Sequence, residues 1–288
     1  MPAAITAIIT ASCRPEQTLV TIGKIHECRP CPDEIIVHID CGHDVLRAVI
    51  EQAFPGIKIL TSTSVIGPGG ARNRLIAAAR HEIVASFDDD SYPIDTDYFA
   101  RLERLFARFP DAAVFAAQVF VRGEPPPPGE GETMWVANFA GCANACRKAA
   151  FLQTAGYVPL QVAYGMEESD VALQLHVLGL QILHASSLRV YHDTDYRGHR
   201  SPNTVACTIA NTALFGYLRY PPVAWPRAIM QTCLSAIYAF RQGRRRGIVS
   251  GFLMIPYRLW SHRQYRRTVS ARVLHSYLEL RRNPRNIA

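Results

Sequence analysis

The stretch Phe87-Asp88-Asp89-Asp90 follows the apolar run Ile83-Val84-Ala85 and decides the fold of this chain. A short apolar run is typical of a buried strand, so its end predicts three carboxylates at the rim of a sheet. Like charges crowded there repel one another unless a cation lies among them. Carboxylate oxygens suit Mg²⁺ or Mn²⁺, which usually share their ligand shell with substrate phosphates. The stretch therefore predicts a metal-bound phosphate ester, and the alternative is a solvated acidic turn that caps the next helix.

Strand-like and helix-like segments alternate around this stretch. Apolar runs predict strands at residues 5–10, 34–39, 57–60, 82–86 and 112–121, whereas helical periodicity predicts helices at 16–28, 44–54 and 71–80. Such alternation is typical of an α/β fold, in which right-handed βαβ units build a mostly parallel sheet flanked by helices. Ligands of such folds bind beyond the carboxyl ends of the strands. Because Asp40 follows the strand at 34–39, we expect it to join Asp88–Asp90 at that edge.

Glycines precede the helix expected at 71–80, in the run Gly67-Pro68-Gly69-Gly70. Such a loop lets a ligand approach the backbone closely, and the free amides of the helix start attract anions. Arg72 lies in the first turn of that helix. The run lacks the Gly-Lys-Ser/Thr of a P-loop, and a tight turn with a surface arginine is the alternative interpretation.

Acidic residues also open a later helix, expected to start within residues 164–170 and to turn Val171, Leu175 and Leu178 inward. The helix dipole stabilises acids in a first turn, so their presence alone does not indicate a function. A carboxylate in this position could nevertheless take the proton of an acceptor hydroxyl as a general base. His192 ends the apolar strand expected at 188–192, where a neutral imidazole could complete a metal shell or simply lie on the surface.

The charge of the chain is divided unevenly. Of the 288 residues, 49% are hydrophobic and 19% are charged, which indicates a globular protein with a sizeable core. Residues 221–288 hold 13 arginines, no lysine and one acid, Glu279, for a net charge of +12, whereas residues 1–220 carry −5. A basic segment of this kind suits an anionic lipid surface or nucleic acid. It contains no recognised nucleic-acid-binding motif, so no nucleic-acid partner is expected.

The cysteines and the apolar segments indicate in which cellular compartment the protein works and whether it contacts a membrane. The eight cysteines lack the spacing of a disulfide framework and suit a reduced, cytoplasmic setting, and no second pair completes the CxxC of Cys28 and Cys31 into a zinc site. No apolar stretch reaches the roughly 18 residues of a spanning helix. The apolar segments 228–240 and 247–257 flank the basic run 241–246, which is typical of helices that lie in a lipid interface. Two core helices joined by a solvated loop are the alternative.

Taken in order, these pieces resemble a family-2 glycosyltransferase of the GT-A fold. The resemblance spans residues 3–195 and rests on the segments 8–15, 36–40, 70–73, 87–90, 141–144 and 167–170, together with His192. It implies a GT-A domain at residues 1–200, with a Rossmann-like, mostly parallel sheet and a nucleotide-sugar donor under its front half. A helical, arginine-rich extension would follow at residues 201–288.

The resemblance also implies roles for individual residues. Glu168 would be the catalytic base, with Asp170 as the fallback, and the metal would be held by Asp88, Asp90 and His192. Asp40 would contact the nucleobase or ribose. The full set expected to contact the donor is Thr10, Ala11, Arg14, Asp40, Arg72, Asp88, Asp89 and Asp90. The acceptor side would include Gly141, Asn144 and Glu167.

The implied reaction is an in-line displacement at the anomeric carbon with inversion, in which Mg²⁺ or Mn²⁺ stabilises the departing nucleoside diphosphate. The acceptor would be a hydroxyl of a glycan or lipid-linked glycan in polysaccharide biosynthesis. The basic extension then suggests a cytoplasmic protein that docks peripherally on the inner face of a membrane.

Three other functions compete with this interpretation. A sugar-phosphate nucleotidyltransferase can use a similar sheet, but it would normally carry a glycine-rich basic signature where this chain has residues 11–15. A haloacid-dehalogenase-type phosphatase needs a downstream lysine, and the only lysines are Lys24, Lys58 and Lys148. A non-catalytic protein that binds through its arginine tail is the alternative outside the enzymes.

Overall fold

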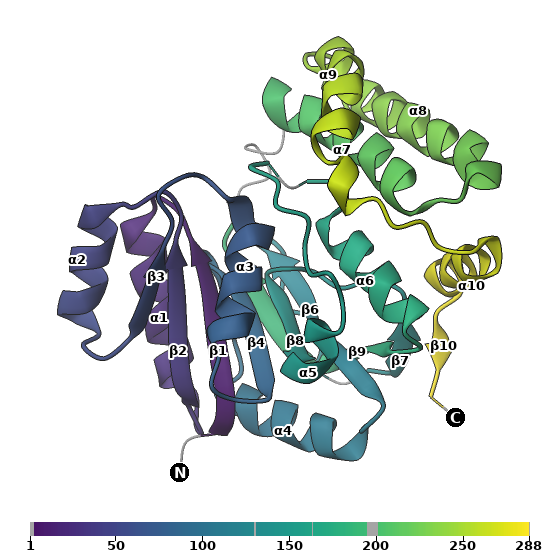
Figure 1. The fold of residues 1–288 in the computed structure, drawn as a ribbon. Helices are drawn as coiled ribbons and strands as arrows, with labels where there is room; N and C mark the ends of the chain where they lie inside the picture. The colour runs from purple at the N-terminus through teal and green to yellow at the C-terminus, as the bar shows by residue number, and fades with distance from the viewer. Residues whose placement is uncertain (1–2, 130, 163, 195–200, 288) are drawn as a thin grey trace.

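The computed structural model of the chain describes residues 3–129, 131–162, 164–194 and 201–287. A single sheet runs through it (Figure 1). Its strands are β1 (Ala3–Ala11), β2 (Pro32–Ile39), β3 (Lys58–Thr61), β4 (Ile83–Asp88), β5 (Ser91–Pro93), β6 (Ala112–Val121), β7 (Thr133–Val136), β8 (Ala143–Arg147), β9 (Gln181–His192) and β10 (Arg285–Asn286). The strand order is β10-β7-β9-β6-β8-β4-β1-β2-β3, and β5 pairs with β9.

The α/β fold predicted from the sequence is confirmed. Strands β3, β2, β1 and β4 are parallel neighbours, and β6 is parallel to β9. Strand β8 inserts between β4 and β6 and runs antiparallel to both. Strands β5, β7 and β10 also pair in the antiparallel direction. The parallel part therefore corresponds to the alternating pattern of the sequence, and the antiparallel strands complete the sheet beyond it.

Helices cover both faces of the sheet. They are α1 (Pro15–Glu27), α2 (Asp44–Ala53), α3 (Gly67–Ala78), α4 (Tyr98–Arg108), α5 (Lys148–Leu152), α6 (Glu167–Val177), α7 (Pro202–Arg219), α8 (Trp225–Arg241), α9 (Ile248–Ser261) and α10 (Ala271–Arg282), with 3₁₀ turns η2 (Pro222–Ala224) and η3 (Arg263–Tyr265). Side chains of α1, α2 and α4 fill one hydrophobic core, and those of α3, α5, α6 and α10 fill the other. Strand β1 serves both cores, because Ile5 and Ile9 point to the first and Ile8 to the second.

Two local predictions differ from the structure. Helix α3 starts at Gly67, four residues before the predicted start, because Asp40 accepts hydrogen bonds from the amides of Ile66 and Gly67 and so caps an earlier turn. Gly67 has a φ of +72°, and a Cβ there would lie 1.8 Å from the carbonyl oxygen of Leu160, so this turn requires glycine. Leu178, predicted to point inward, is 45% exposed because α6 ends there.

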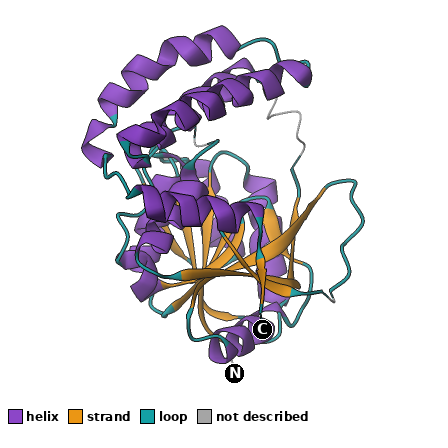
Figure 2. Cartoon of the chain, turned by 90° about the vertical axis from the view of Figure 1, so that its right-hand side faces the viewer, coloured by secondary structure: helices purple, strands orange, loops and turns teal. Residues whose placement is uncertain are grey.

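The C-terminal helices form a layer of their own and then return to the sheet. Helices α7, α8 and α9 stack beyond the carboxyl ends of the strands (Figures 1 and 2), around a small core that includes Val205 and Ala236. Helix α10 packs back on α6, where the Tyr277 hydroxyl donates to the carbonyl of Ser169, and β10 then pairs with β7. Within the described ranges, no helix combines the length and the apolar character that crossing a membrane requires.

A buried ion pair joins this layer to helix α6. Asp170 on α6 is fully buried, and the nearly buried Arg219 at the end of α7 donates to both of its carboxylate oxygens, one of them over 2.9 Å. Arg219 also donates to the carbonyls of Tyr265 and Arg267. One arginine therefore fixes α6, α7 and the segment after η3 to one another, and loss of either charge would leave the other buried without a partner.

Candidate active site

Strands β2, β1 and β4 end together and bring the expected acids to one edge of the sheet. Thr10 is in register with Asp88, and its hydroxyl donates to Asp88 Oδ1 over 2.8 Å. The amide of Asp40, directly after β2, donates to the carbonyl of Ala11 over 3.0 Å. The parallel arrangement therefore places Asp40 and Asp88 on either side of the end of β1, at the edge where such folds bind ligands.

Arg14 pairs with the two acids that follow Asp88. Its guanidinium, at the start of α1, forms ion pairs with Asp89 and with Asp90, the latter at 2.5 Å. Burial raises the pKa of Asp89 to about 6, although the charge of Arg14 opposes this shift. Burial acts on Asp90 in the same direction, but hydrogen bonds from His192 and Arg14 outweigh it and hold the pKa of Asp90 below its ordinary value.

Asp88, Cys142 and His192 form a cluster that could hold a metal ion. One ligand atom from each lies within 4.8 Å of the other two. The Nε2 atom of His192 lies 3.1 Å from Asp90 Oδ1, and its Nδ1 atom lies 3.8 Å from the sulfur of Cys142. Burial would lower the pKa of His192, but its hydrogen bond with Asp90 raises it to about 10. Because metals bind neutral imidazole, a metal ion and the imidazole proton would compete for this position.

The cluster differs in one residue from the predicted metal set of Asp88, Asp90 and His192. Asp90 contacts His192 but also forms the ion pair with Arg14, and Cys142 takes the third place among the grouped ligand atoms. Carboxylate and imidazole donors fit a divalent ion, and the thiol makes the set softer than the all-oxygen shell typical of Mg²⁺. The sequence carries no signal for Cys142, because its position depends on β8 running antiparallel to β4.

Arg72 is the buried cation of the site. It forms an ion pair with Asp88, and its Nε donates to the hydroxyl of Ser86 over 3.3 Å. A second guanidinium nitrogen lies 3.7 Å from Glu167, and the ring centroid of Tyr157 lies 5.9 Å from the guanidinium carbon. Arg72 is only 2% exposed, so its desolvation is offset by these carboxylates and this ring. It thereby links the end of β4 to the start of α6.

Glu167 and Glu168 at the start of α6 accept hydrogen bonds from two different backbone amides. Gly69 donates to Glu167 over 3.0 Å, and Gly141 donates to Glu168 over 3.2 Å. A Cβ at position 141 would lie 2.6 Å from Glu168 Oε1 and 2.8 Å from the guanidinium carbon of Arg72, so a side chain there would have to displace one of these two groups. Glu167 is buried and Glu168 is half-buried. Of the two, Glu168 is the carboxylate that a ligand at this edge could reach.

Asp40 is largely occupied by the protein itself. Its carboxylate accepts hydrogen bonds from the Ser62 hydroxyl over 2.7 Å and from the amides of Ile66 and Gly67 over 3.0 and 2.9 Å. Burial would raise the pKa of Asp40, but these hydrogen bonds outweigh it and lower the pKa. A contact from Asp40 to a nucleobase or ribose would have to use the acceptor capacity that remains.

Two other predicted residues face the interior. Asn144 is buried and donates to the carbonyls of Ala140 and Gly141, so it shapes the turn before β8. Asp170 is fully buried in its ion pair with Arg219. The role of Asp170 as fallback base stays a prediction, and deprotonating an acceptor from this position would require breaking that pair inside the protein.

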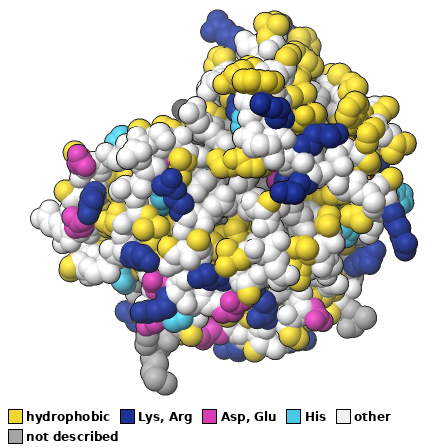
Figure 3. Space-filling view, in the orientation of Figure 1, with side chains coloured by type: hydrophobic (Ala, Val, Ile, Leu, Met, Phe, Trp, Pro, Cys, Tyr) yellow, Lys and Arg dark blue, Asp and Glu magenta, His cyan; other side chains and the backbone are white. Residues whose placement is uncertain are grey.

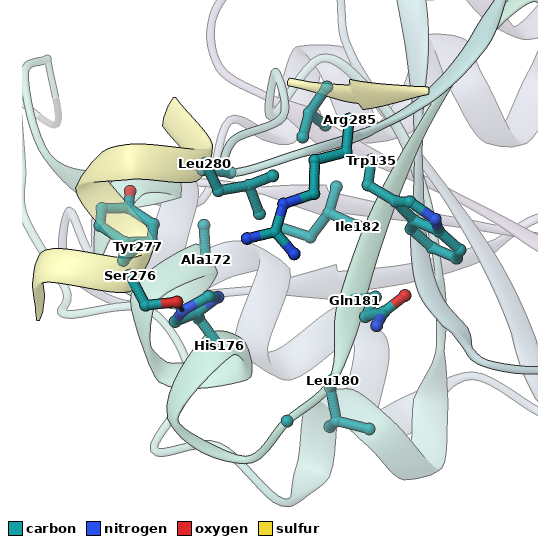
Figure 4. Close-up of a pocket in the computed structure, with 13 residues that line it drawn as sticks. Trp135, Ala172, His176, Leu180, Gln181, Ile182, Ser276, Tyr277, Leu280 and Arg285 are labelled. Carbon is teal, nitrogen blue, oxygen red and sulfur yellow. Dashed lines mark hydrogen bonds between the residues drawn. The ribbon is translucent and has the colours of Figure 1, made fainter. Parts of the chain in front are cut away.

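A pocket of about 190 Å³ lies at the start of β9, whereas His192 of the candidate site lies at its end (Figure 4). The guanidinium of Arg285 points into it, and His176 Nε2 lies 3.2 Å from the Ser276 hydroxyl in its wall. Gln181 at the start of β9 lines this pocket, whereas His192 is the last residue of β9, so a length of roughly 35 Å of strand separates the two places. This pocket is not part of the carboxylate edge.

The acids at the carboxyl ends of β2 and β4 and the acidic start of α6 lie at the positions from which the resemblance to GT-A glycosyltransferases was drawn. Residues 7–156 match the family described as Glycosyl transferase family 2, and the chain belongs to this family. Among curated proteins no sequence matches the chain. Family membership and the GT-A fold are thus as the sequence predicted, and they disfavour the phosphatase and the arginine-tail binder.

Solved structures support the same fold. The mannosyltransferase PcManGT from Pyrobaculum calidifontis, in complex with GDP-Man and Mn²⁺, has a TM-score of 0.59 at 14% identity, covering 97% of this chain and 87% of its own. GalNAc-T7 with UDP, GalNAc and Mn²⁺ has a TM-score of 0.61 at 14% identity, with 91% and 58% covered. S. aureus TarS has a TM-score of 0.54 at 16% identity, with 74% and 39% covered.

The buried Glu167 predicts a pH dependence of stability. Burial raises its pKa to about 8 from an ordinary value of 4.5. Between these two values the folded protein binds more protons than the unfolded chain, so stability falls as the pH rises and the loss is complete above pH 8. Glu167→Gln keeps the acceptor for Gly69 and does not titrate. Urea unfolding at pH 5, 7 and 9 should show the variant gaining stability relative to wild type as the pH rises, and parallel curves would contradict this account.

Proposed function

We propose that this protein transfers a sugar from a nucleoside-diphosphate sugar to an acceptor hydroxyl, with inversion at the anomeric carbon. The observation that carries the proposal is that Arg72 brings Asp88 and the start of α6 together, so that a metal-binding group and a reachable carboxylate share one edge. Membership of the glycosyltransferase family supports it. PcManGT is in complex with GDP-Man and Mn²⁺, and the structure of GalNAc-T7 contains UDP, GalNAc and Mn²⁺.

In this proposal Asp88 and His192 hold a Mn²⁺ or Mg²⁺ ion, with Asp90 and Cys142 beside them. The ion, when bound, neutralises the negative charge of the diphosphate leaving group. Thr10 keeps the carboxylate of Asp88 oriented through its hydrogen bond. Arg72 holds the same carboxylate from the interior, so the ligand geometry is fixed before a donor arrives.

The donor lies against the ends of β1 and β2, and the acceptor lies toward α6. Arg14 is the cation that a donor phosphate meets, because 42% of its side chain is exposed while its partners Asp89 and Asp90 are buried. Ala11 and Asp40 form the floor for the nucleoside.

On the acceptor side, Glu168 takes the proton of the attacking hydroxyl, and the lack of a side chain at Gly141 leaves it room. Glu167 and Asn144 do not touch the acceptor in this proposal. They position the backbone through hydrogen bonds, Glu167 with the amide of Gly69 and Asn144 with the carbonyls of Ala140 and Gly141.

The acceptor in this proposal is a glycan or a lipid-linked glycan presented at an anionic membrane surface. Helices α8 and α9 expose large apolar side chains, which Figure 3 shows gathered over this layer with arginines beside them. The exposed residues include Ile229, Leu234, Phe240, Leu253, Tyr257 and Trp260. The loop between the two helices adds the exposed Arg245 and Arg246. Apolar side chains next to arginines are typical of a surface that lies in a lipid interface.

Replacement of the proposed base tests the reaction. The protein is incubated with Mn²⁺, a panel of nucleoside-diphosphate sugars and candidate glycan acceptors, and release of nucleoside diphosphate is measured. Glu168→Gln should lower the acceptor-dependent rate by about 10²- to 10⁴-fold, because general-base catalysis contributes that much. Glu51→Gln, on the exposed face of α2, is the matched control and should react like wild type. A full rate from Glu168→Gln, or release of pyrophosphate instead, refutes the proposal.

Vesicle binding tests the membrane contact. The double variant Arg245→Gln/Arg246→Gln should bind phosphatidylserine-containing vesicles roughly thirtyfold more weakly at low salt, because each arginine near the surface contributes about 1 kcal/mol. The double variant Arg104→Gln/Arg108→Gln removes the same charge from exposed positions on α4 and should bind like wild type. Equal losses in both variants would show that net charge alone matters, and no loss in either would exclude this surface.

A further inference from the structure

An apolar groove of about 490 Å³ runs between α7, α8 and α9. Ala213 and Tyr217 of α7 form its floor, and its walls include Trp225 and Ile229 of α8 with Phe252 and Leu259 of α9. Its described lining residues belong to α7, α8 and α9, whereas the candidate active site lies at the carboxyl ends of the strands and at the start of α6. Its size falls within the range of small-ligand pockets.

The packing of the three helices explains why the groove exists. A Cβ at Gly216 would lie 2.4 Å from the Cβ of Ala228, so the glycine brings α8 close to α7. Gly251 brings α9 against Ala206 and Ile209 of α7 in the same way. Helices α8 and α9 thus both pack on α7 and contact each other much less, which leaves a channel between them.

The lining of the groove selects for a hydrocarbon. Among the described residues that line it, hydroxyls belong only to Thr232 and Tyr217, and the Thr232 hydroxyl already donates to the carbonyl of Ala228 over 2.9 Å. None of these described lining residues carries a charge. A polar occupant would lose its water without gaining partners, whereas an apolar chain would be removed from water together with the aromatic and aliphatic walls.

Arg266 contacts Tyr217, which lines the groove, and so adds a preference for negative charge beside it. The guanidinium carbon of Arg266 lies 5.1 Å from the ring centroid of Tyr217, and its Nε donates to the Tyr217 carbonyl over 3.2 Å. Arg266 is exposed, and no carboxylate of the described residues forms an ion pair with it. Arg263 and Arg267 flank it in the sequence. The occupant that matches both features is an amphiphile with a hydrocarbon chain and a phosphate.

We infer that the groove binds one hydrocarbon chain of a lipid phosphate, with Arg266 at the phosphate, and that this lipid is the carrier of the acceptor. The inference deepens the proposed function and rests on it. Two residues after Tyr217, Arg219 forms the ion pair with Asp170, two residues from Glu168. The part of α7 that lines the groove is therefore fixed to α6, the helix that carries the proposed base. A lipid bound in the groove would keep its glycan near the proposed acceptor side.

A cysteine in the groove makes binding measurable without any catalysis. Cys233 lines the groove and is exposed, whereas the exposed Cys41 follows β2 and is not among the residues that line the groove. The full chain is mixed with farnesyl phosphate and pulsed with N-ethylmaleimide, and labelling of each cysteine is followed by peptide mass spectrometry. Saturating farnesyl phosphate should slow labelling of Cys233 at least about tenfold and leave Cys41 unchanged. Inorganic phosphate alone should protect nothing.

Two variants separate the chain from the phosphate. Arg266→Gln should need about tenfold more farnesyl phosphate for the same protection, because it loses a charge-assisted hydrogen bond. Arg272→Gln, an exposed arginine on α10, is the matched control and should bind like wild type. Farnesol should protect wild type and Arg266→Gln equally.

Several results would overturn the inference. Cys233 would label at the same rate at every farnesyl phosphate concentration, or only intact bilayers would protect it, which would make the face a membrane contact rather than a lipid site. Protection that grows with protein concentration in the absence of lipid would instead assign the groove to a second copy of the chain. Failure here is distinguishable from failure of the proposed reaction, because donor-dependent release of nucleoside diphosphate with a soluble acceptor does not use the groove.

Discussion

The balance of charge at the carboxyl end of β4 is the constraint on which the rest of this structure depends. Five carboxylates, from Asp88 to Asp90 and from Glu167 and Glu168, gather around two arginines, Arg14 and Arg72. Burying so many like charges would be unfavourable without those cations. Arg72 is buried and contacts Asp88 and Glu167 from the interior side of the site. The remaining cluster of Asp88, Cys142 and His192 is where the proposed divalent ion and diphosphate would bind.

Arg72 also fixes the proposed metal site and the proposed base relative to each other. Asp88 belongs to the strand that carries the proposed metal site, and Glu167 belongs to the helix that carries the proposed base. Because Arg72 contacts both, a shift of α6 relative to β4 would separate the guanidinium from Glu167 or from Asp88. The pair of Asp170 and Arg219 extends this chain of fixed contacts to α7 and so to the layer that bears the apolar groove.

Local patterns in the sequence predicted much of this arrangement. The alternation of strands and helices, the strand that ends in Asp88 and the acidic start of α6 are all features of neighbouring residues, and they predicted the parallel part of the sheet and the acids at its carboxyl edge. The GT-A fold and the family follow from the order of these segments. The strand that includes His192 was also anticipated, although β9 begins seven residues earlier than the predicted segment.

What could not be predicted depends on contacts between distant segments. Cys142 joins the candidate metal cluster because β8 enters the sheet against β4, and Asp170 is held in an ion pair because α7 brings Arg219 to it. The early start of α3 depends on Asp40, 27 residues before Gly67. Leu178 matched the helical spacing, but spacing does not show where a helix ends. In each case the residue type was visible in the sequence and its partner was not.

The most direct test is to locate the metal. Crystals of the protein grown with Mn²⁺ and a nucleoside diphosphate would show the ion by anomalous scattering. The account predicts one peak within coordination distance of Asp88 and His192, with the diphosphate bound to the same ion and Arg14 beside it. A diphosphate bound at this edge with no ion, or an ion bound away from Asp88 and His192, would contradict the account.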